Sequence, residues 1–586
     1  MSYSVERNAQ IIVSLLKQHR IRYVVASPGT TNIPLVVTFQ RDPYFKVFSC
    51  VDERSAAYVA CGLAATGGEP VVLSCTGATA SRDYMPGLTE AYYRKLPVIA
   101  LTSFNGNRKI GQLVPQNLDR TVIPNDIALK SVQIPVVRDN TDAVYCTRLV
   151  NDALLECFRR GGGPVHLNIE TSYTPEFVEG KLPVYRKINR YGYEDQFPKL
   201  NQKAKIVVFI GAHQPFKDQE AAALERFVHR YNAIVFVDHT SNYSGDGAFL
   251  STLATDNTRS SDEALKPDLI IMVGEISGDY PTANYLDSTN AVSWRVSRDG
   301  EIRDRFNTLT AVFECSEQFF FDRYADAMDD DSTDSYYRAW SARDLELRAR
   351  IPELPFSGRW IAQTASSKVP VKSIMHFAIL NALRSWNYFS YDKSVRGFCN
   401  TGGFGIDGPM STLFGSALAE PSTVNYLITG DLAFFYDMNI LGNRDLMKNI
   451  RILLVNNGLG DEMHMSYSIG SQLHDDEFKY VCADGHFRSH LDGMSAAGSW
   501  ATAMGVSYSR AENKQQFMEQ IDKFMDPNNE GPILLECVTT PDADAQAGTM
   551  LTQLDPNINR EKKLKKAIKN IVPNSIIQKT KKMLSK

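Results

Sequence analysis

Short apolar runs alternate with stretches of helical periodicity along most of the chain. The runs contain few polar positions, as is typical of strands that are buried on both faces of a parallel sheet. Such runs occur at residues 23–26, 70–75, 97–102, 206–210, 233–237, 268–274, 452–455 and 533–538. Strands separated by helices in this way predict an α/β fold built from doubly wound parallel sheets.

Two polar stretches, near 186–203 and 328–360, divide this pattern into three segments. A length of 586 residues is typical of about three or four domains. We therefore predict α/β domains at 1–185, 200–345 and 365–548, followed by a basic tail at 555–586. In the middle segment a lone Gly211 follows an apolar run without the further glycines of a dinucleotide fingerprint, so no nucleotide site is expected there.

Two polar motifs follow neighbouring apolar runs in the last segment. Gly430-Asp431 comes after the first run, and Asn456-Asn457 comes 25 and 26 residues after Asp431, directly behind the second run. A helix is expected between them, over 438–447, which makes a strand–helix–strand unit whose strand ends share one edge of the sheet. A carboxylate and an amide oxygen there are hard ligands that suit Mg²⁺ or Ca²⁺, although Gly-Asp alone is also common in ordinary loops.

Charge and cysteine content narrow the class of protein. The formal net charge is −4, yet residues 560–586 carry ten Lys or Arg and one Glu, so the rest of the chain is more acidic than the total. An acidic body argues against general nucleic-acid binding. Nine cysteines without C-x-x-C spacing are typical of buried thiols in a reducing compartment. No signal peptide and no apolar run of about 20 residues is found, so a cytoplasmic location is expected.

The spacing of Gly430-Asp431 and Asn456-Asn457 resembles that of the thiamine-diphosphate (ThDP) enzymes. That family also needs a glutamate from another domain, and Glu53 in Asp52-Glu53-Arg54-Ser55 is similar to it. The resemblance implies Mg²⁺ held by Asp431, Asn457 and the carbonyl of Leu459. It also implies that Glu53 hydrogen-bonds the aminopyrimidine ring of ThDP, and that a homodimer or homotetramer forms the active site between subunits.

Further segments resemble, within this family, the menaquinone-pathway synthases that decarboxylate 2-oxoglutarate and add the product to isochorismate. The matching segments are 27–35, 52–57, 405–412 and 430–439, and order and spacing agree over about residues 5–545. The resemblance implies the domain architecture of the acetolactate-synthase-like enzymes. The residues that it implies for cofactor binding are Pro28, Gly29, Glu53, Thr76, Gly405, Ile406, Asp407, Gly430, Asp431, Leu432, Ala433 and Asn457.

Two positions depart from the synthase pattern, because Thr31 and Thr401 stand where those enzymes have arginines. Arginine holds a carboxylate through two hydrogen bonds, whereas threonine offers one neutral hydroxyl. The cofactor residues are therefore kept while the substrate pocket differs, which indicates a paralogue with another substrate. Two further catalytic candidates are Gln116, by partial resemblance to an acetolactate-synthase loop, and His464. A solvated loop glutamine and a structural histidine are the alternatives.

These features predict an enzyme that decarboxylates a 2-oxo acid and transfers the resulting carbanion to an acceptor, forming a C–C bond. Simple decarboxylation that releases an aldehyde, and the menaquinone-pathway reaction itself, remain the alternatives. A nicotinamide or flavin oxidoreductase is not favoured, because no glycine fingerprint is found. In the tail, five lysines between 562 and 569 alternate with apolar positions. That pattern is typical of a helix that lies on an anionic membrane, or of a solubilising tail.

Overall fold

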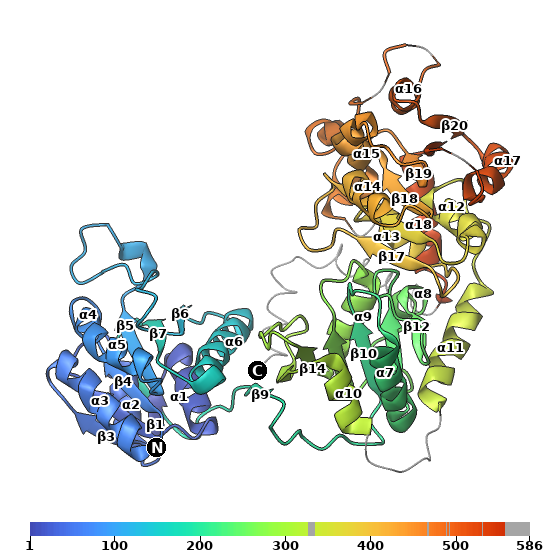
Figure 1. Cartoon of the computed structure of the whole chain (residues 1–586). Helices are drawn as coiled ribbons and strands as arrows, with labels where there is room; N and C mark the ends of the chain where they lie inside the picture. Colours follow the sequence, from blue (N-terminus) through green and yellow to red (C-terminus); the bar gives the residue numbers. More distant parts are fainter. Residues whose placement is uncertain (326–333, 466–467, 488, 492, 530, 557–586) are drawn as a thin grey trace. The chain divides into compact units, whose positions relative to one another are not determined.

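The structure is a computed structural model, and it describes residues 1–325, 334–465, 468–487, 489–491, 493–529 and 531–556. It contains two compact units (Figure 1). The first consists of Met1–Gly192 with Gly300–Val312, and the second consists of Tyr193–Asp299 with the described residues of Phe313–Lys586. The basic tail predicted at 555–586 lies, from residue 557 on, outside the described residues.

The first unit is built on a six-stranded sheet with the order β3-β2-β4-β5-β7-β6. Every neighbouring pair in this sheet is parallel. The strands are β2 (Tyr23–Ala26), β3 (Lys46–Ser49), β4 (Val71–Cys75), β5 (Val98–Phe104), β6 (Lys130–Ile134) and β7 (Val165–Glu170). The helices are α1 (Arg7–Gln18), α2 (Ile33–Arg41), α3 (Glu53–Gly67), α4 (Ala80–Asp83), α5 (Met85–Tyr93) and α6 (Asn140–Glu156). The short strands β1 (Ser2–Ser4) and β8 (Phe177–Glu179) form a separate antiparallel pair.

Both faces of this sheet are buried, because alternate side chains of one strand enter different hydrophobic clusters. Val24 of β2 packs with residues of α1 and α6, whereas its neighbour Val25 packs with residues of α3 and α5. The helices on the second face approach closely: a Cβ on Gly87 of α5 would lie 2.4 Å from Cβ of Ala57 in α3. The near-continuous apolar runs of the sequence thus correspond to strands covered by helices on both sides, which is the predicted doubly wound arrangement.

The second unit begins with a parallel sheet that includes the order β12-β11-β10-β13-β14. These strands are β10 (Ile206–Ile210), β11 (Ile234–Val237), β12 (Ala248–Leu250), β13 (Leu269–Val273) and β14 (Val292–Ser297). The helices of this part are α7 (Asp218–Tyr231), α8 (Thr252–Asp256), α9 (Tyr280–Thr289), α10 (Glu317–Ala325) and α11 (Ser335–Arg348). A Cβ on Gly211, directly after β10, would lie 1.8 Å from the carbonyl oxygen of Glu275. Gly211 therefore allows its own backbone to approach that of Glu275 closely.

The remainder of the second unit carries a six-stranded sheet with the order β17-β16-β18-β19-β21-β20, again with parallel neighbours throughout. Its strands are β16 (Ile374–Phe377), β17 (Arg396–Cys399), β18 (Asn425–Gly430), β19 (Ile450–Asn456), β20 (Ser507–Ala511) and β21 (Ile533–Val538). Its helices are α12 (Gly358–Ala365), α13 (Asn381–Trp386), α14 (Pro409–Ala419), α15 (Asp431–Asp437), α16 (Ala496–Ala503), α17 (Lys514–Met525) and α18 (Pro541–Thr552). Counted along the chain, its strands follow the same spatial order as those of the first unit, second-first-third-fourth-sixth-fifth.

The helix predicted over 438–447 was misplaced. Helix α15 begins at Asp431 itself, directly after β18, and a 3-10 helix follows at Met438–Gly442. The apolar residues that suggested the later helix belong partly to this short 3-10 helix, in which Leu441 is buried. The earlier start matters for function, because it puts the carboxylate of Asp431 on the first turn of a helix.

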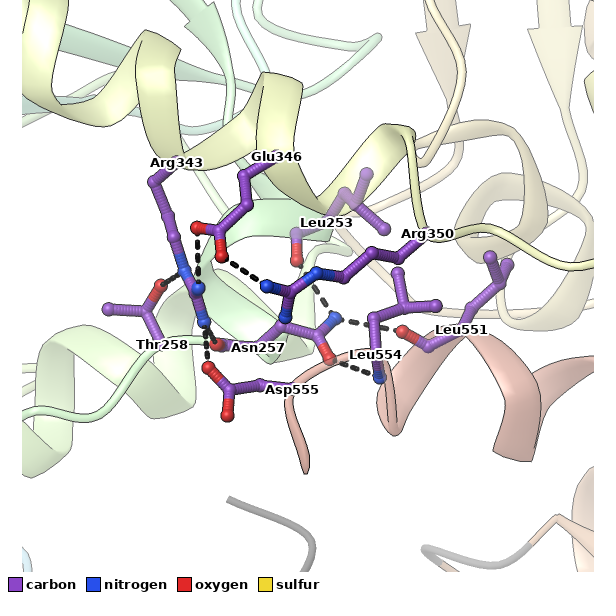
Figure 2. A network of polar contacts seen from close by, with 9 residues as sticks. All are labelled: Leu253, Asn257, Thr258, Arg343, Glu346, Arg350, Leu551, Leu554 and Asp555. Carbon is purple, nitrogen blue, oxygen red and sulfur yellow. Dashed lines mark hydrogen bonds and ion pairs between the residues drawn. The ribbon is translucent and has the colours of Figure 1, made fainter. Parts of the chain in front are cut away.

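A polar network joins the two sheet-containing parts of the second unit (Figure 2). The amide of Asn257, at the end of α8, donates to the carbonyl of Leu551 at 2.8 Å and accepts the N–H of Leu554 at 3.0 Å. Arg343 of α11 pairs with Asp555 at 2.5 Å. Asn257 is only 1% exposed, so its amide supplies partners to backbone groups that would otherwise be buried without them.

The nine cysteines form no disulfide, and six of them are buried. No helix among the described residues is long and apolar enough to cross a membrane. The predicted boundaries of the three domains stay predictions, since the second and third of them belong to one compact unit.

Candidate cofactor and metal site

Two polar loops meet at the carboxyl edge of the C-terminal sheet. Strands β18 and β19 are adjacent and parallel, with Gly430 opposite Val455. Asp431 therefore follows the end of one strand, and Asn457 follows the end of the next, at the same edge. This is the convergence that the spacing of the two motifs predicted.

The carboxylate of Asp431 is 6% exposed and faces the loop that follows β19. Its Oδ2 accepts N–H groups from Gly458 at 2.8 Å and Leu459 at 3.1 Å, and its Oδ1 accepts the N–H of Leu432 at 2.8 Å. Oδ1 of Asn457 accepts the N–H groups of Leu459 at 3.3 Å and Gly460 at 3.2 Å. Burial raises the pKa of Asp431, and these N–H bonds oppose the shift. The side-chain oxygens of Asp431 and Asn457 thus accept hydrogen bonds from the same backbone N–H groups, those of Leu459 and Gly460.

The two asparagines of the motif have different environments. The side-chain amide of Asn456 donates to Oε1 of Glu536 at 2.7 Å, and Glu536 is 1% exposed. Asn456 is thereby fixed to strand β21, whereas Oδ1 of Asn457 accepts the loop N–H groups of Leu459 and Gly460. The carbonyl of Leu459 accepts the N–H of Ala483 at 3.1 Å. The two asparagines thus differ, since Asn457 accepts two N–H groups that Asp431 also accepts, whereas the amide of Asn456 donates to a carboxylate of β21.

One cavity of about 120 Å³ collects six of the residues predicted for cofactor binding. Its lining includes Ile406, Gly430, Asp431, Leu432, Ala433 and Asn457. A second cavity of about 420 Å³ shares Asp431, Leu432 and Asn457 and adds Leu459. Gly405 and Asp407 flank Ile406, and a Cβ on Gly405 would lie 2.3 Å from Oδ1 of Asp407. Most of the residues predicted in the C-terminal part therefore line the cavities around Asp431, whereas Gly405 and Asp407 line neither of the two.

Two further buried carboxylates, Asp461 and Asp544, line the first cavity, and the sequence motifs did not indicate them. Asp461 begins a 3-10 helix (Asp461–His464) and accepts the amide of Asn381 at 2.7 Å. Burial, followed by the charge of Asp544, raises the pKa of Asp461 to about 7. Asp544 of α18 accepts the N–H of Gly358 at 2.7 Å, and burial raises its pKa as well. Asp461 lies four residues after Asn457, whereas Asp544 is distant in sequence and carries no local motif.

The first unit places its predicted residues at the carboxyl edge of its own sheet. Helix α3 starts at Glu53, which is half-buried, and the side chain of Asp52 caps the helix by accepting the N–H of Ser55 at 2.7 Å. The loops after β2 and β4 touch at Gly29, where a Cβ would lie 2.5 Å from Cβ of Thr76. Pro28, Gly29, Glu53 and Thr76 thus follow three strands of one sheet at the same edge.

The two other catalytic candidates are not among the described residues that line the cavities around Asp431. Gln116 is exposed in the long loop between β5 and β6, with φ of +64°. The ring of His464 stacks on Phe478 with 4.1 Å between ring centroids. Their catalytic roles stay predictions.

The two threonines that depart from the synthase pattern have different surroundings. Oγ1 of Thr31 hydrogen-bonds the hydroxyl of Thr76, and it contacts the hydroxyl of Ser103 at 2.9 Å and the carbonyl of Ser103 at 3.1 Å. Thr401 is 5% exposed and lines a different cavity, of about 580 Å³, together with Arg295 and Glu317. Both threonines are neutral, so neither position carries the positive charge that an arginine would have.

Comparison with known proteins agrees with this geometry. The family described as "Thiamine pyrophosphate enzyme, N-terminal TPP binding domain" matches residues 7–123. The chain is 31% identical over 568 residues to the 2-succinyl-5-enolpyruvyl-6-hydroxy-3-cyclohexene-1-carboxylate synthase of Bacteroides thetaiotaomicron, covering 93% of this chain and 98% of that protein. The synthase of the same name from Phocaeicola vulgatus is 29% identical over 556 residues, with 92% of this chain and 97% of that protein covered.

At 93% of the chain, the match extends over both units. The resemblance stated for the sequence is therefore confirmed at the level of the family. The chain belongs to the thiamine-diphosphate-dependent enzymes, in the branch that contains 2-succinyl-5-enolpyruvyl-6-hydroxy-3-cyclohexene-1-carboxylate synthase.

Proposed function

We propose that this protein is a ThDP- and Mg²⁺-dependent enzyme that decarboxylates a 2-oxo acid and transfers the resulting carbanion to an acceptor, forming a C–C bond. The observation that carries the proposal is the convergence of Asp431 and Asn457 on the amides of Leu459 and Gly460, at the cavity that Ile406 lines. Carboxylate and amide oxygens beside backbone N–H groups suit a divalent cation that carries a diphosphate.

The residues around Asp431 fit both Mg²⁺ and the diphosphate of ThDP. Asp431, Asn457 and the carbonyl of Leu459 would hold Mg²⁺, once the loop N–H groups now bonded to the two side chains turn to the diphosphate. Gly430, Leu432 and Ala433 would line the diphosphate, and Ile406 would support the bend of the cofactor from the apolar side. When bound, ThDP supplies an electron sink for the carbanion that decarboxylation leaves.

The other steps belong to side chains of this protein. Glu53 would hold a proton between its carboxylate and the aminopyrimidine ring, at the start of a helix whose dipole favours the negative charge. The apolar lining around Ile406 and Ile428 would exclude water from the diphosphate end of the site. His464 and Gln116 are candidates for protonation and positioning of the substrate.

We do not assign the substrates of the two relatives to this protein. The two relatives are named as a synthase of 2-succinyl-5-enolpyruvyl-6-hydroxy-3-cyclohexene-1-carboxylate, whereas Thr31 and Thr401 are neutral here. Each lost arginine would remove a charged hydrogen bond worth roughly 1.5–3 kcal/mol. We therefore favour a paralogue with another substrate pair. Simple decarboxylation, and the relatives' own reaction, are the competing activities.

A panel assay tests the proposed activity. The full-length protein with ThDP and Mg²⁺ is incubated with single 2-oxo acids, each with and without carbonyl or alkene acceptors, and with 2-oxoglutarate plus isochorismate. Mass spectrometry follows the products. The proposal expects carbon dioxide release with a ligated product for one pair, and little or no product from isochorismate. Aldehyde formation alone would favour the decarboxylase, and efficient use of isochorismate would reject the paralogue.

Assembly and location are part of the proposal. In the family that this chain resembles, the cofactor lies between the first domain of one subunit and the third domain of its partner, which supports a homodimer or homotetramer. We also propose a cytoplasmic enzyme, with membrane contact through the basic tail as a further hypothesis. Sedimentation of the full chain and of a truncation after Asp555 with anionic liposomes tests the tail. Equal pelleting of the two proteins would reject it.

A further inference from the structure

A buried arginine in the first unit has no acidic partner. Arg120 lies in the long loop between β5 and β6, and its side chain is folded back into the protein so that the residue is 3% exposed. Residues 1–192 are all described, and none of their acidic side chains forms an ion pair with Arg120. An unpaired buried charge is costly, so proteins keep one where a ligand completes it.

Two contacts of the guanidinium and one of the backbone hold Arg120 in place. Nη1 of Arg120 donates to the hydroxyl of Ser81 at 2.9 Å, and Cζ lies over the ring of Phe104 at 5.2 Å from the centroid. The backbone carbonyl of Arg120 accepts the side chain of Gln133, on β6, at 3.2 Å. The group is thus positioned by contacts that leave part of its hydrogen-bonding capacity unused.

The unused capacity lies on one edge of the group. Nε and Nη2 of Arg120 are buried and have no hydrogen-bond partner within the protein. These two nitrogens form the side-on edge of a guanidinium, which presents two parallel N–H donors. That spacing matches the two oxygens of a carboxylate. Burial lowers the pKa of Arg120 to about 10, so the side chain stays charged at neutral pH.

The position of Arg120 relates it to the predicted cofactor residues of the same unit. A Cβ on Gly77 would lie 3.2 Å from its Nη1 and 3.1 Å from the carbonyl oxygen of Ser103. Ser103 and Thr76, the residue before Gly77, are the partners of Thr31. Arg120 therefore lies beside the hydroxyl cluster that stands where the relatives are expected to have an arginine.

The charges of Glu53 and Arg120 both act on one buried side chain, that of Cys75. Burial raises the pKa of Cys75 to about 12, and the charges of Arg120 and Glu53 act on this thiol with opposite signs. Cys75 ends β4, so the cation and the glutamate are on the same edge of one sheet. A ligand at Arg120 would lie near the ring chemistry that Glu53 is proposed to support.

We propose that Arg120 binds the carboxylate of the 2-oxo acid or acceptor through Nε and Nη2, with the hydroxyls around Thr31 beside it. The inference rests on the proposed function and makes it more specific: the cation at this edge comes from position 120 and not from position 31. It predicts that the substrate carries an acid group that remains after the reaction, or that the carboxylate to be lost is first held here.

The test uses the full-length protein with ThDP and Mg²⁺, and three variants. Arg120→Met removes the charge at similar volume, and Arg120→Lys keeps the charge but lacks the side-on edge. Arg94→Met is the matched control, because it removes one exposed arginine at the other edge of the sheet. Succinate and acetate are the carboxylate probes, with propionamide as the neutral counterpart and inorganic phosphate as the other anion.

We expect succinate or acetate to raise the melting temperature of the wild type and of Arg94→Met. Both Arg120 variants should need at least tenfold more carboxylate for the same shift, and KM for the 2-oxo acid should rise by a similar factor. Propionamide should have no effect on any of the four proteins. Arg120→Met should melt no lower than the wild type without probe, because it removes an unpaired buried charge.

Three results would overturn the inference: unchanged carboxylate response in Arg120→Lys, a response to phosphate but not to carboxylates, or a lower melting temperature of Arg120→Met with unchanged KM. The last would assign Arg120 a structural role over Phe104. Failure of the proposed function is visible separately, since ThDP would then bind neither the wild type nor the variants, whatever the carboxylate probes do.

Discussion

The N-terminal and C-terminal sheets have the same strand order, yet their carboxyl edges carry opposite chemistry. The C-terminal edge gathers the buried carboxylates of Asp431, Asp461 and Asp544 around one cavity. The N-terminal edge holds neutral hydroxyls, one glutamate and the buried cation of Arg120. Strand order fixes where loops emerge, and loop residues decide what each edge binds. Under the proposed function, one topology would thus supply an edge for the metal and diphosphate and a separate edge for the ring and the substrate acid.

The difference also explains how each edge tolerates its charge. Backbone N–H groups of the loop after β19 compensate Asp431, so it remains satisfied before a cation arrives. Arg120 has no such compensation on Nε and Nη2. Under the proposed function, the first edge would take up a metal and the second would be completed by an anion. The first two of the following predictions each remove one element of this contrast, and the other two concern stability within the second unit.

The largest effect is expected from Asp431→Ala at the metal edge. Loss of the buried carboxylate removes a metal ligand and the acceptor for three loop N–H groups, so ThDP and Mn²⁺ binding should fall at least a hundredfold. Electron paramagnetic resonance of Mn²⁺ in the presence of ThDP measures this. Asp445→Ala, an exposed carboxylate on the same unit, is the control and should bind as the wild type does. Equal metal binding by the Asp431 variant would remove this residue from the metal site.

Glu53→Gln should affect the proton chemistry proposed for the N-terminal edge and leave cofactor binding at the C-terminal edge intact. The variant should keep the fold and bind ThDP normally, but exchange of the C2 proton of ThDP should slow by roughly 10²–10⁴-fold, because a neutral amide cannot hold the proton at the ring. Nuclear magnetic resonance of quenched samples in D₂O gives the exchange rate. Asp52→Asn changes the neighbouring cap and should leave the rate intact. Wild-type exchange in Glu53→Gln would contradict the assignment.

A stability change of moderate size is expected where the two parts of the second unit meet. Asn257→Ala leaves the carbonyl of Leu551 and the N–H of Leu554 without partners, which should lower the free energy of unfolding by about 2–3 kcal/mol. Arg350→Ala, in the same network but in an exposed pair with Glu346, should cost less than about 1 kcal/mol. Urea denaturation of both variants compares them. Equal losses of stability in the two variants would mean that the buried hydrogen bonds of Asn257 add no more to the junction than the exposed ion pair does (Figure 2).

The smallest effect concerns pH and the middle sheet. Burial alone would lower the pKa of His213, but the hydrogen bond to Glu317 and its charge outweigh burial and raise it. A raised pKa means that the pair stabilises the fold below about pH 6.5 and that this contribution is lost as the pH rises through the folded value. His213→Gln should therefore lower the melting temperature slightly at pH 6 and leave it unchanged at pH 9. An equal loss at both values would contradict the ionic origin.

Much of this organisation could be predicted from the sequence, because it depends on local signals. Apolar runs buried on both faces predicted the parallel sheets, and the spacing of Gly430-Asp431 and Asn456-Asn457 predicted that these two motifs meet at one edge. The helix start at Asp431 was missed, since the apolar positions around 441 mimic helical periodicity. Asp544 and Arg120 carry no motif. Their roles come from packing between segments far apart in the chain, which no single-sequence pattern reports.

The central claim is that the edge around Asp431 holds ThDP through a divalent cation. Titration calorimetry of the full-length wild type with ThDP, with Mg²⁺ and then with the metal removed by chelation, tests it most directly. The account predicts saturable binding that requires the metal. Absence of binding at millimolar ThDP and Mg²⁺, or equal binding after chelation, would contradict it.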